Sequence, residues 1–250
     1  MNEALAEAAR AIRAADSVVA LTGAGVSTAS GIPDFRSEGG LWEKHDPQNF
    51  HYSRFRADPE GFWRDRLAMF EDIYAGGDIA PNPAHEAFAD LESAGHLSAL
   101  ITQNIDGLHR AAGSGDVVEL HGTGAEVVCM DCGERDGADP AWETVKAGNA
   151  PPRCDSCEGV LKPAVVLFGQ SMPQAELHRA QSLASNSDVF IVAGSSLSVE
   201  PAASLPRTAA RNGATTICVN LEETGFDADY TFTADVTDVL PRLVTAVRKP

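Results

Sequence analysis

The chain is poor in lysine and has an excess of acidic residues. It carries 19 Lys and Arg against 36 Asp and Glu, only 4 of the basic residues are lysine, and its formal net charge is −17 at pH 7. Nonspecific binding to nucleic acid depends on basic residues that neutralise phosphates, so this composition argues against it. The acidic surface is either an ordinary solvated surface encoded by a GC-rich genome or an adaptation to a cytosol of high salt. We favour the second, because salt screens the repulsion between the acidic groups.

Long apolar runs are missing as well. No stretch approaches the roughly 18–20 residues of a membrane span, although 44% of the residues are hydrophobic and suffice for a core. Residues 1–16 are acidic and rich in alanine. They predict an amphipathic helix and lack the basic and apolar regions of a signal peptide. We therefore expect a cytoplasmic protein without a membrane partner.

Cysteine is scarce, but four of the five cysteines form two CxxC pairs, Cys129 with Cys132 and Cys154 with Cys157. Four thiolates in this pattern are typical of tetrahedral zinc. Because all four ligand positions would be filled, the zinc would be structural. Two disulfides are the alternative, which a cytoplasmic protein would not keep, and a redox-active CxxC fits paired motifs less well. We expect Cys218 in a buried strand.

A glycine turn, Gly23-Ala24-Gly25, follows the apolar run at residues 17–21. Such a turn is typical of a pyrophosphate site, since glycine lets backbone N–H groups come close to phosphates. The third glycine of a dehydrogenase fingerprint would fall at residue 28, which is threonine. The turn alone is therefore weak evidence, and an ordinary tight turn is the alternative. A loop with a proline, an acid, an aromatic and a guanidinium follows at residues 33–36.

Further apolar runs also end in small and polar residues. The expected strands cover residues 17–22, 97–102, 117–120, 165–168, 188–193 and 215–219, and in one-letter code they lead into GAG, QNID, HG, FGQ, GSS and NLE. Helices are expected at residues 2–15, 59–74, 84–94, 173–186, 201–212 and after 238. In open α/β sheets, ligands bind beyond the carboxyl ends of parallel strands. The sequence therefore predicts an α/β fold with one polar ligand site.

His121 ends one of these expected strands. Imidazole has a pKa near physiological pH, so a histidine here is a candidate general base, although a lone histidine is more often structural. Asn104 and Asp106 lie where they can bind a ligand or cap a helix. The aromatic stripe of residues 59–74 is more typical of core packing than of a site.

In their order, these motifs resemble the sirtuin (Sir2) family of NAD-dependent protein lysine deacylases, from about residue 17 to residue 241. The resemblance implies a Rossmann-like NAD-binding domain at residues 1–40, 95–124 and 160–250. It implies a smaller domain made of a helical module, residues 41–94, and a zinc module, residues 125–159. NAD would be a co-substrate, acyl-lysine proteins the substrates, and nicotinamide, free lysine and O-acyl-ADP-ribose the products.

The resemblance also implies roles for matched residues. His121 would be the base that deprotonates a ribose hydroxyl, and Asn104 would assist catalysis. Val166 and Phe168 would lie at a strand edge that binds the substrate peptide by β-augmentation. The expected cofactor contacts are Gly23, Ala24, Gly25, Ser27, Asp34, Phe35, Arg36, Trp42, Gln103, Asn104, Ile105, Asp106, Gly194, Ser195, Ser196, Asn220, Leu221, Glu222 and Val236.

The preferred acyl group is less settled. Gln170 replaces the glutamate usual in the family, which leaves peptide preference open. Relatives that remove succinyl or malonyl groups carry a Tyr-x-x-Arg pair, and Trp63 and Arg66 lie in what resembles the same helix. Arg66 could bind an acyl carboxylate, whereas Trp63 offers only its indole N–H. The alternative places Arg66 on the solvent face or pairs it with Asp65. We expect deacetylation as the main activity and acidic-acyl removal as the alternative.

Two other functions stay open. A protein mono-ADP-ribosyltransferase would use the same NAD site, although it has less need of a base such as His121. A non-catalytic NAD-binding or zinc-binding interaction protein would need neither this base nor the whole cofactor loop.

The acidic composition generates a first prediction. If the surface is adapted to high salt, the protein should lose structure and activity in dilute buffer and keep both in molar KCl, because salt screens its mutual repulsion. Circular dichroism and turnover along a KCl series measure this. Equal structure and activity at both ends of the series would contradict the adaptation.

Overall fold

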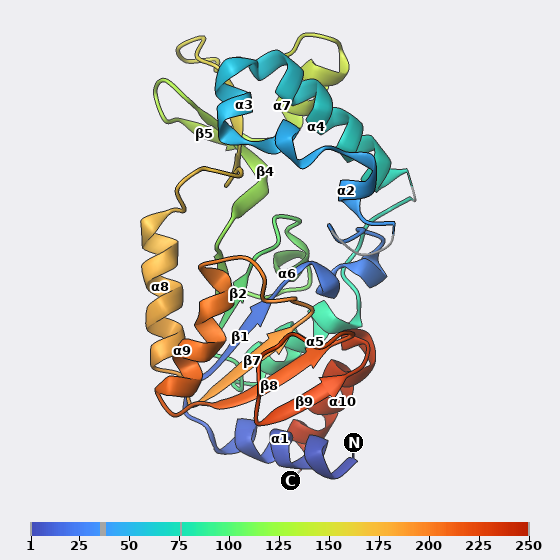
Figure 1. Cartoon of the computed structure of the whole chain (residues 1–250), viewed down its shortest axis with the longest axis vertical. Coiled ribbons are helices and arrows are strands. Elements are labelled where there is room, and N and C mark those ends of the chain that lie inside the picture. Colours follow the sequence, from blue (N-terminus) through green and yellow to red (C-terminus); the bar gives the residue numbers. More distant parts are fainter. Residues whose placement is uncertain (1, 36–38, 76, 250) are drawn as a thin grey trace.

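The computed structural model describes residues 2–35, 39–75 and 77–249. Its centre is a parallel six-stranded sheet in the order β3-β2-β1-β7-β8-β9 (Figure 1). The strands are β1 (Val18–Thr22), β2 (Ala99–Thr102), β3 (Val117–Glu119), β7 (Val189–Ala193), β8 (Thr215–Asn220) and β9 (Tyr230–Thr233). β1, β2 and β7 are buried along their whole length, as expected for parallel strands covered on both faces.

Helices cover both faces of this sheet. α1 (Asn2–Ala14), α5 (Pro83–Ser93) and α10 (Val236–Arg248) pack on one face, and α8 (Gln174–Ser185) and α9 (Leu205–Arg211) on the other. Alternate residues of a strand serve the two faces, so Ile191 packs toward α10 and Val192 toward α9. Burying each such side chain stabilises the fold by about 1.5–3 kcal/mol.

A smaller unit lies beyond the ends toward which β1 and β7 point (Figure 1). Its sheet has the order β5-β4-β6 and is antiparallel, with β4 (Gly122–Cys129), β5 (Arg135–Gly137) and β6 (Leu161–Val165). The helices α2 (Leu41–Lys44), α3 (Tyr52–Ala57), α4 (Pro59–Tyr74) and α7 (Asp139–Lys146) pack around an aromatic core that includes Phe62, Trp63 and Trp142. The remaining short helices are η1 (Ala24–Val26), η2 (Thr28–Ser30), η3 (Pro47–Phe50), α6 (Leu108–Ala111) and η4 (Ala202–Ser204).

The helix predicted at residues 59–74 is confirmed with the same bounds. Asp58 caps it by accepting a hydrogen bond from the N–H of Gly61, and Pro59 stands in its first turn. The last helix begins at Val236, earlier than predicted, because Asp235 accepts from the N–H of Thr237 and caps it there. Within the described ranges, no helix is both long and apolar enough to cross a membrane.

The prediction that a strand at residues 165–168 joins the parallel sheet is wrong. β6 ends at Val165 and pairs antiparallel with β4 in the small sheet. The sixth parallel strand is instead β9, Tyr230–Thr233, which the sequence did not predict because its polar, alternating residues form no continuous apolar run. An apolar run predicts a buried strand, but it does not tell which sheet the strand joins.

The packing of α5 and β6 favours domain boundaries that differ from those expected from the sequence. Ala87, Phe88 and Leu91 of α5 belong to the core shared with α1 and α10, not to the helical module. Val165, the last residue of β6, and Leu167, two residues beyond it, belong to the aromatic core of the small unit. We therefore propose that the helical module ends before Pro83 and that the small domain includes β6, in place of boundaries at residues 94 and 160.

Candidate active site

The glycine turn after β1 lies directly against the turn after β7. A Cβ on Gly23 would lie 2.8 Å from the carbonyl oxygen of Gly194, and one on Gly25 would lie 3.0 Å from the Gly194 Cα. The N–H of Gly23 donates to Ala193 and that of Gly25 to Gly194, at 3.2 and 2.8 Å. These two N–H groups therefore join the two turns. The sequence had suggested that they would face a phosphate instead. Glycine is needed here for close backbone approach.

The residues after β2 connect the turns of three neighbouring strands. The amide nitrogen of Gln103 donates to the hydroxyl of Ser195 at 2.9 Å, and its backbone N–H donates to the carbonyl of Thr22. Ser195 is buried, whereas Ser196 is exposed and shares a hydrogen bond with Ser198. The structure therefore brings the predicted GAG, QNID and GSS segments together.

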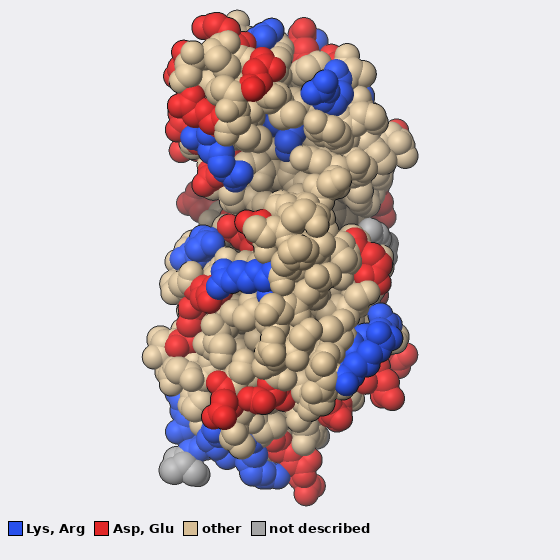
Figure 2. All heavy atoms as spheres, turned by 90° about the vertical axis from the view of Figure 1, so that its left-hand side faces the viewer, with Lys and Arg blue, Asp and Glu red and all other residues tan. Residues whose placement is uncertain are grey.

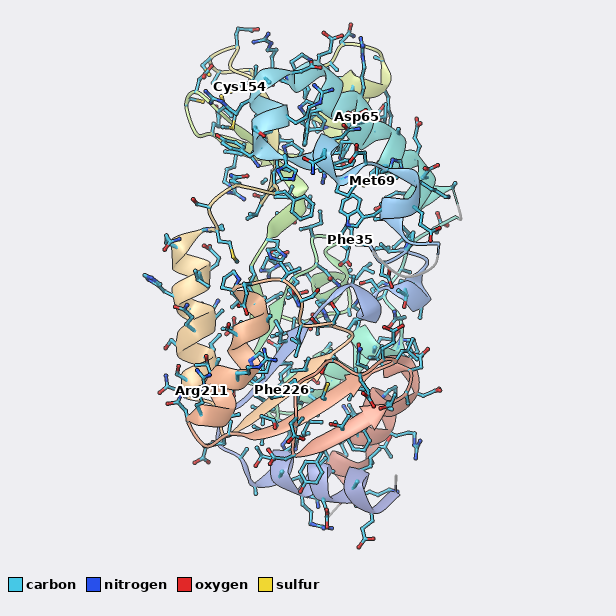
Figure 3. The ribbon with its side chains drawn as sticks, viewed as in Figure 1. Phe35, Asp65, Met69, Cys154, Arg211 and Phe226 are labelled. Atoms are coloured by element: carbon cyan, nitrogen blue, oxygen red, sulfur yellow. The ribbon has the colours of Figure 1, made fainter. Side chains whose placement is uncertain are left out.

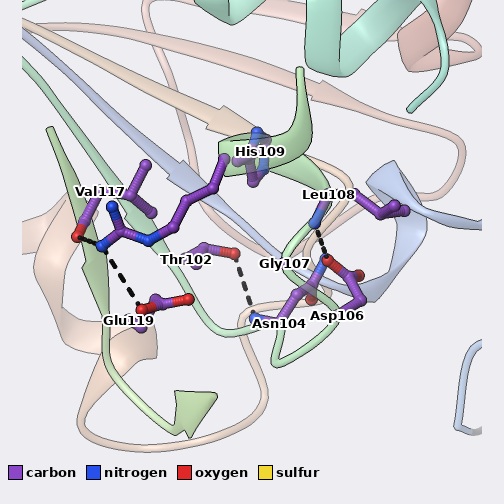
Figure 4. A pocket seen from close by; sticks show the side chains of 9 residues that line it. Thr102, Asn104, Asp106, Gly107, Leu108, His109, Val117 and Glu119 are labelled. Carbon is purple, nitrogen blue, oxygen red and sulfur yellow. Dashed lines mark hydrogen bonds and ion pairs between the residues drawn. The ribbon is translucent and has the colours of Figure 1, made fainter. Parts of the chain in front are cut away.

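Asn104 and Asp106 are held by hydrogen bonds within this turn (Figure 4). The backbone N–H of Asn104 donates to the hydroxyl of Thr102, and its side-chain amide donates to the carbonyl of Gly23 and to the hydroxyl of Ser27, both at 3.1 Å. One carboxylate oxygen of Asp106 accepts from the N–H of Leu108, and the other accepts from Ser27 at 2.7 Å. Asp106 thus accepts from the first N–H of α6, but the N-cap residue of this helix is Gly107, so the prediction that Asp106 is the N-cap is wrong.

Ile105, in the same segment, contacts the small unit. Its carbonyl accepts the N–H of Gly124 at 2.8 Å, and a Cβ on Gly124 would lie 2.9 Å from that oxygen. The side chain of Ile105 packs against the aromatic core of the small unit. The segment from Gln103 to Asp106 therefore touches both parts of the molecule.

His121 lies between the two sheets. Its Nδ1 is 2.8 Å from the carbonyl oxygen of Gln103, and because a carbonyl only accepts, Nδ1 carries the proton. In the neutral ring, Nε2 is then the free acceptor. Burial lowers the pKa of His121 below its usual 6.5, and the hydrogen bond to Gln103 opposes this. The ring of His121 therefore has a fixed orientation, and its Nε2 can accept a proton.

The residue after His121 must be glycine. Gly122 has φ +75°, and a Cβ there would lie 2.1 Å from the carbonyl oxygen of Ala164. The carbonyl of His121 itself accepts from the N–H of Val166 at 2.8 Å. The end of β3 is thus joined to the end of β6, and the candidate base is fixed at this junction.

Aromatic side chains from separate segments pack against one another. Trp42 lies 5.1 Å from Phe35 and 5.9 Å from Phe168, measured between ring centroids, and His51 lies 5.5 Å from Phe168. Phe35 is 38% exposed and Phe168 40%, unusual values for large apolar side chains. The carbonyl of Phe35 accepts from the N–H of Trp42, and that of Asp34 accepts from Leu41. Arg36, also predicted here, lies outside the described residues.

The other predicted cofactor residues lie at the ends of β8 and β9. Asn220 donates to the carbonyl of Glu222, Leu221 is 63% exposed, and a hollow of about 410 Å³ adjoins Asn220 and Glu222. Val236 opens α10 with its side chain buried in the core, so only its backbone can face a ligand.

Trp63 does not lie where it could bind substrate. Its side chain is fully buried, and its indole N–H donates to the carbonyl of Leu161 at 2.9 Å. Arg66 is also buried, so the alternative that placed its guanidinium on the solvent face is wrong. Among the described residues, its Nε has no hydrogen-bond partner. Asp65 pairs instead with Arg54 at 3.7 Å.

The four cysteines of the two CxxC motifs come together as predicted. Their sulfurs lie within 4.8 Å of one another, with 3.4 Å between Cys129 and Cys157 and 3.8 Å between Cys132 and Cys154. Tetrahedral zinc with Zn–S bonds of about 2.3 Å places sulfurs about 3.8 Å apart, so the geometry fits this metal. Figure 3 shows Cys154 at the end of the small unit remote from Phe35, which fits a structural metal.

Sequence reasoning missed several buried polar residues beneath the site. His85 and His109 lie edge to face at 4.8 Å, and both are almost fully buried. Nε2 of His109 lies 2.9 Å from the hydroxyl of Thr22, and Nε2 of His85 lies 3.4 Å from that of Ser27. The only signal in the sequence was that His85 falls in the first turn of an expected helix. That position predicts a capping residue equally well.

The fold and the site define a Rossmann-like protein with a histidine of fixed orientation between its two units and a four-cysteine cluster whose geometry suits a metal. The Sir2 family model matches residues 23–201, and the chain belongs to this family. An NAD-dependent protein deacetylase of Haloarcula marismortui is 56% identical over 97% of this chain and 94% of that protein.

Two solved complexes are also similar. A Sir2–p53 peptide–NAD+ complex has a TM-score of 0.83 at 38% identity and covers 94% of this chain and 95% of that chain. A histidine-to-alanine variant of Sir2 with deacetylated p53 peptide and 3′-O-acetyl-ADP-ribose has a TM-score of 0.85 at 37% identity, covering 96% of both chains.

The cysteine cluster generates a prediction. Chelation of the metal, or Cys154→Ser, should destabilise the small unit, because a structural zinc site contributes directly to folding. The melting temperature and the metal content by atomic absorption measure this. Cys218→Ser is the matched control, since Cys218 lies in the other core. An unchanged melting temperature after complete metal removal would contradict a structural role.

Proposed function

We propose that this protein removes acyl groups, acetyl above all, from lysine side chains of proteins with NAD as co-substrate. The products are nicotinamide, free lysine and O-acyl-ADP-ribose. The observation that carries this proposal is the orientation of His121, whose Nδ1 is bonded to Gln103 and whose Nε2 is left as the acceptor. The relative named above, an NAD-dependent protein deacetylase, supports the same reaction.

Each group of the site has a role in this proposal. NAD supplies the ribose carbon to which the acyl oxygen is transferred when nicotinamide leaves. Nε2 of His121 accepts the proton of a ribose hydroxyl, so that this oxygen can attack the acyl carbon. Asn104 and Asp106 hold the ribose and the nicotinamide amide, and the ring of Phe35 excludes water from the reacting carbon. Because burial lowers the pKa of His121, the ring is unprotonated at neutral pH and can accept this proton.

The substrate peptide is proposed to lie along residues 165–169. Phe168 is exposed here, and its carbonyl accepts from the N–H of Tyr52 at 2.9 Å, which fixes the chain just before it turns at Gly169. Gln170 folds back and accepts from the N–H of Leu167 at 3.2 Å. The exposed ring of Phe168, just beyond the end of β6, supports recognition of a peptide along this segment by strand addition.

His121 provides the direct test. His121→Ala should lower kcat by about 100-fold or more, the usual contribution of a general base, and leave NAD affinity nearly unchanged. Wild-type kcat should rise with pH through a pKa below 6.5, since only the neutral ring accepts the proton. Mass spectrometry of an acetyl-lysine peptide measures turnover, and calorimetry measures NAD binding. Unchanged turnover in the variant, or ADP-ribose attached to protein in place of deacylation, would contradict the proposal.

Removal of acidic acyl groups is the second candidate, and the burial of Arg66 favours it. Burial lowers the pKa of Arg66 to about 10, and the neighbouring Lys162 is buried as well, with both carbonyls of Pro163 and Val165 accepting from its ammonium group. Burying a guanidinium without an acidic partner destabilises the fold, because the charge loses its hydration without gaining an ion pair. A succinyl or malonyl carboxylate would supply that partner.

Arg66→Met separates the two acyl preferences. If Arg66 binds an acyl carboxylate, the variant should lose roughly 10- to 100-fold in kcat/KM for a succinyl-lysine peptide, the worth of a charge-assisted hydrogen bond. Activity on the acetyl-lysine peptide should persist. Arg64→Met is the control, because Arg64 lies on the exposed face of the same helix and pairs with Glu60. Equal loss on both peptides would exclude this role.

The surface is consistent with protein substrates. On the face in Figure 2, Lys and Arg occur in separate groups among Asp and Glu and form no continuous basic stripe. This distribution supports our proposal that the protein does not bind nucleic acid directly. We also propose that it acts on acyl-lysine proteins in the cytoplasm, without a membrane partner.

A further inference from the structure

The loop residues Asp34 and Phe35 are hydrogen-bonded to a short helix, α2. The carbonyl of Asp34 accepts from the N–H of Leu41 at 2.8 Å, and that of Phe35 accepts from the N–H of Trp42 at 3.1 Å. Both donors stand at the start of α2, which has only 4 residues. An isolated helix of this length is not stable in water, so contacts with other segments must hold α2 in place.

Trp42 of this helix lies between two exposed rings. Its ring centroid is 5.1 Å from that of Phe35 and 5.9 Å from that of Phe168. The proposed function uses the ring of Phe35 to exclude water from the reacting carbon, and it places the substrate peptide along the segment that includes Phe168. The position of α2 therefore affects both the NAD side and the peptide side of the site.

A contact with α4 fixes the other end of α2, which lies beside α4 (Figure 1). His45 follows α2, and its N–H donates to the carbonyl of Leu41 at 3.0 Å. Nε2 of His45 lies 2.9 Å from an oxygen of Asp72 on α4, and because a carboxylate only accepts, Nε2 is the donor. The side chain of His45 is 13% exposed and that of Asp72 46%, so this hydrogen bond is partly shielded from water.

His45 also packs against an aromatic side chain. Its ring stands edge to face with Phe50 at 6.5 Å, and Phe50 lies 5.7 Å from Trp42. Phe50 is buried in the aromatic core of the small unit and offers both rings a fixed surface to pack on. His45 therefore holds Trp42 in two ways, through the backbone of α2 and through the ring of Phe50.

We propose that His45 and Asp72 are positioning residues, whose hydrogen bond holds α2 against α4. Trp42 is thereby kept between Phe35 and Phe168, in the position that NAD and the substrate peptide require. This inference rests on the proposed function for the places where the two substrates bind. It assigns His45 and Asp72 no contact with either substrate, and no proton is transferred between them.

Substitutions on both sides of the hydrogen bond test this role. His45→Phe keeps a ring beside Phe50 but has no donor for Asp72, and Asp72→Ala removes the acceptor. His45→Gln places an amide nitrogen near the position of Nε2 and can still donate. Glu71→Ala is the matched control, because it removes an exposed carboxylate from the same turn of α4.

Acrylamide quenching of tryptophan fluorescence measures the position of α2 without any turnover. The chain has 3 tryptophans, and since Trp63 and Trp142 are buried, a change in quenching reports Trp42. We expect His45→Phe and Asp72→Ala to increase the quenching. Both should also weaken NAD binding, measured by calorimetry, and raise KM for NAD by roughly three- to tenfold, the scale of one lost hydrogen bond to a charged group at a partly exposed position.

The conservative and double variants separate positioning from a general loss of stability. His45→Gln should keep NAD affinity within about twofold of the wild type, because the donor is retained. His45→Phe combined with Asp72→Ala should cost little more than either change alone, because both remove the same hydrogen bond. Melting temperatures are measured for all variants, and those of His45→Phe and Asp72→Ala should stay close to that of Glu71→Ala.

Two results would overturn the inference. One is quenching and NAD affinity that stay at the wild-type level in both His45→Phe and Asp72→Ala. The other is a loss that follows melting temperature or that Glu71→Ala shares, which would leave the pair only a structural role. Failure of the proposed function is recognised separately, as absence of deacylation by the wild type, and quenching then still decides whether the hydrogen bond positions α2.

Discussion

The hydrogen bond between Nδ1 of His121 and the carbonyl of Gln103 is the contact on which the site depends. It fixes the tautomer and the plane of the ring, because a carbonyl only accepts. The carbonyl of His121 accepts in turn from Val166 of the small unit. One residue therefore joins the parallel sheet to the small sheet. Gly122 follows with φ +75° and no room for a Cβ, so the chain can turn from one sheet into the other only with glycine there.

The metal cluster and the candidate base are connected by a single strand. β4 begins at Gly122, beside His121, and ends at Cys129, a cluster cysteine. At about 3.3 Å per residue, its eight residues keep the metal roughly 23 Å from the base. The cluster is thus too remote for chemistry on the substrate, but it fixes one end of the strand whose other end carries the site. A small antiparallel sheet of three strands gains much of its stability from such a metal.

Local signals in the sequence predicted the segments of the site better than they predicted how the elements pack. The glycine turn, the segment from Gln103 to Asp106 and His121 were found because each follows a short apolar run, and parallel strands bring such ends together. Other features depend on contacts between distant segments. The pairing of β6 with β4 and the packing of α5 on α10 could not follow from periodicity alone. The burial of Arg66 breaks the rule that charged helix residues face water, and the hydrogen bonds of the Ser27 hydroxyl join three separate segments.

Three of the histidines near the site, His85, His109 and His121, differ only in their surroundings. Burial lowers the pKa of His85 to about 4 and that of His109 to about 3, and the proximity of the two rings lowers the latter further. Both are therefore neutral throughout the range in which an enzyme works, and their hydrogen bonds do not change with pH. His121 is also buried, but its donor bond to a carbonyl favours the charged form and opposes the desolvation. A protein that must accept a proton at one nitrogen, while holding its other polar groups in fixed orientation, needs this difference. The pH dependence of turnover that we propose for His121 should then carry no contribution from His85 or His109, because both have already lost their protons.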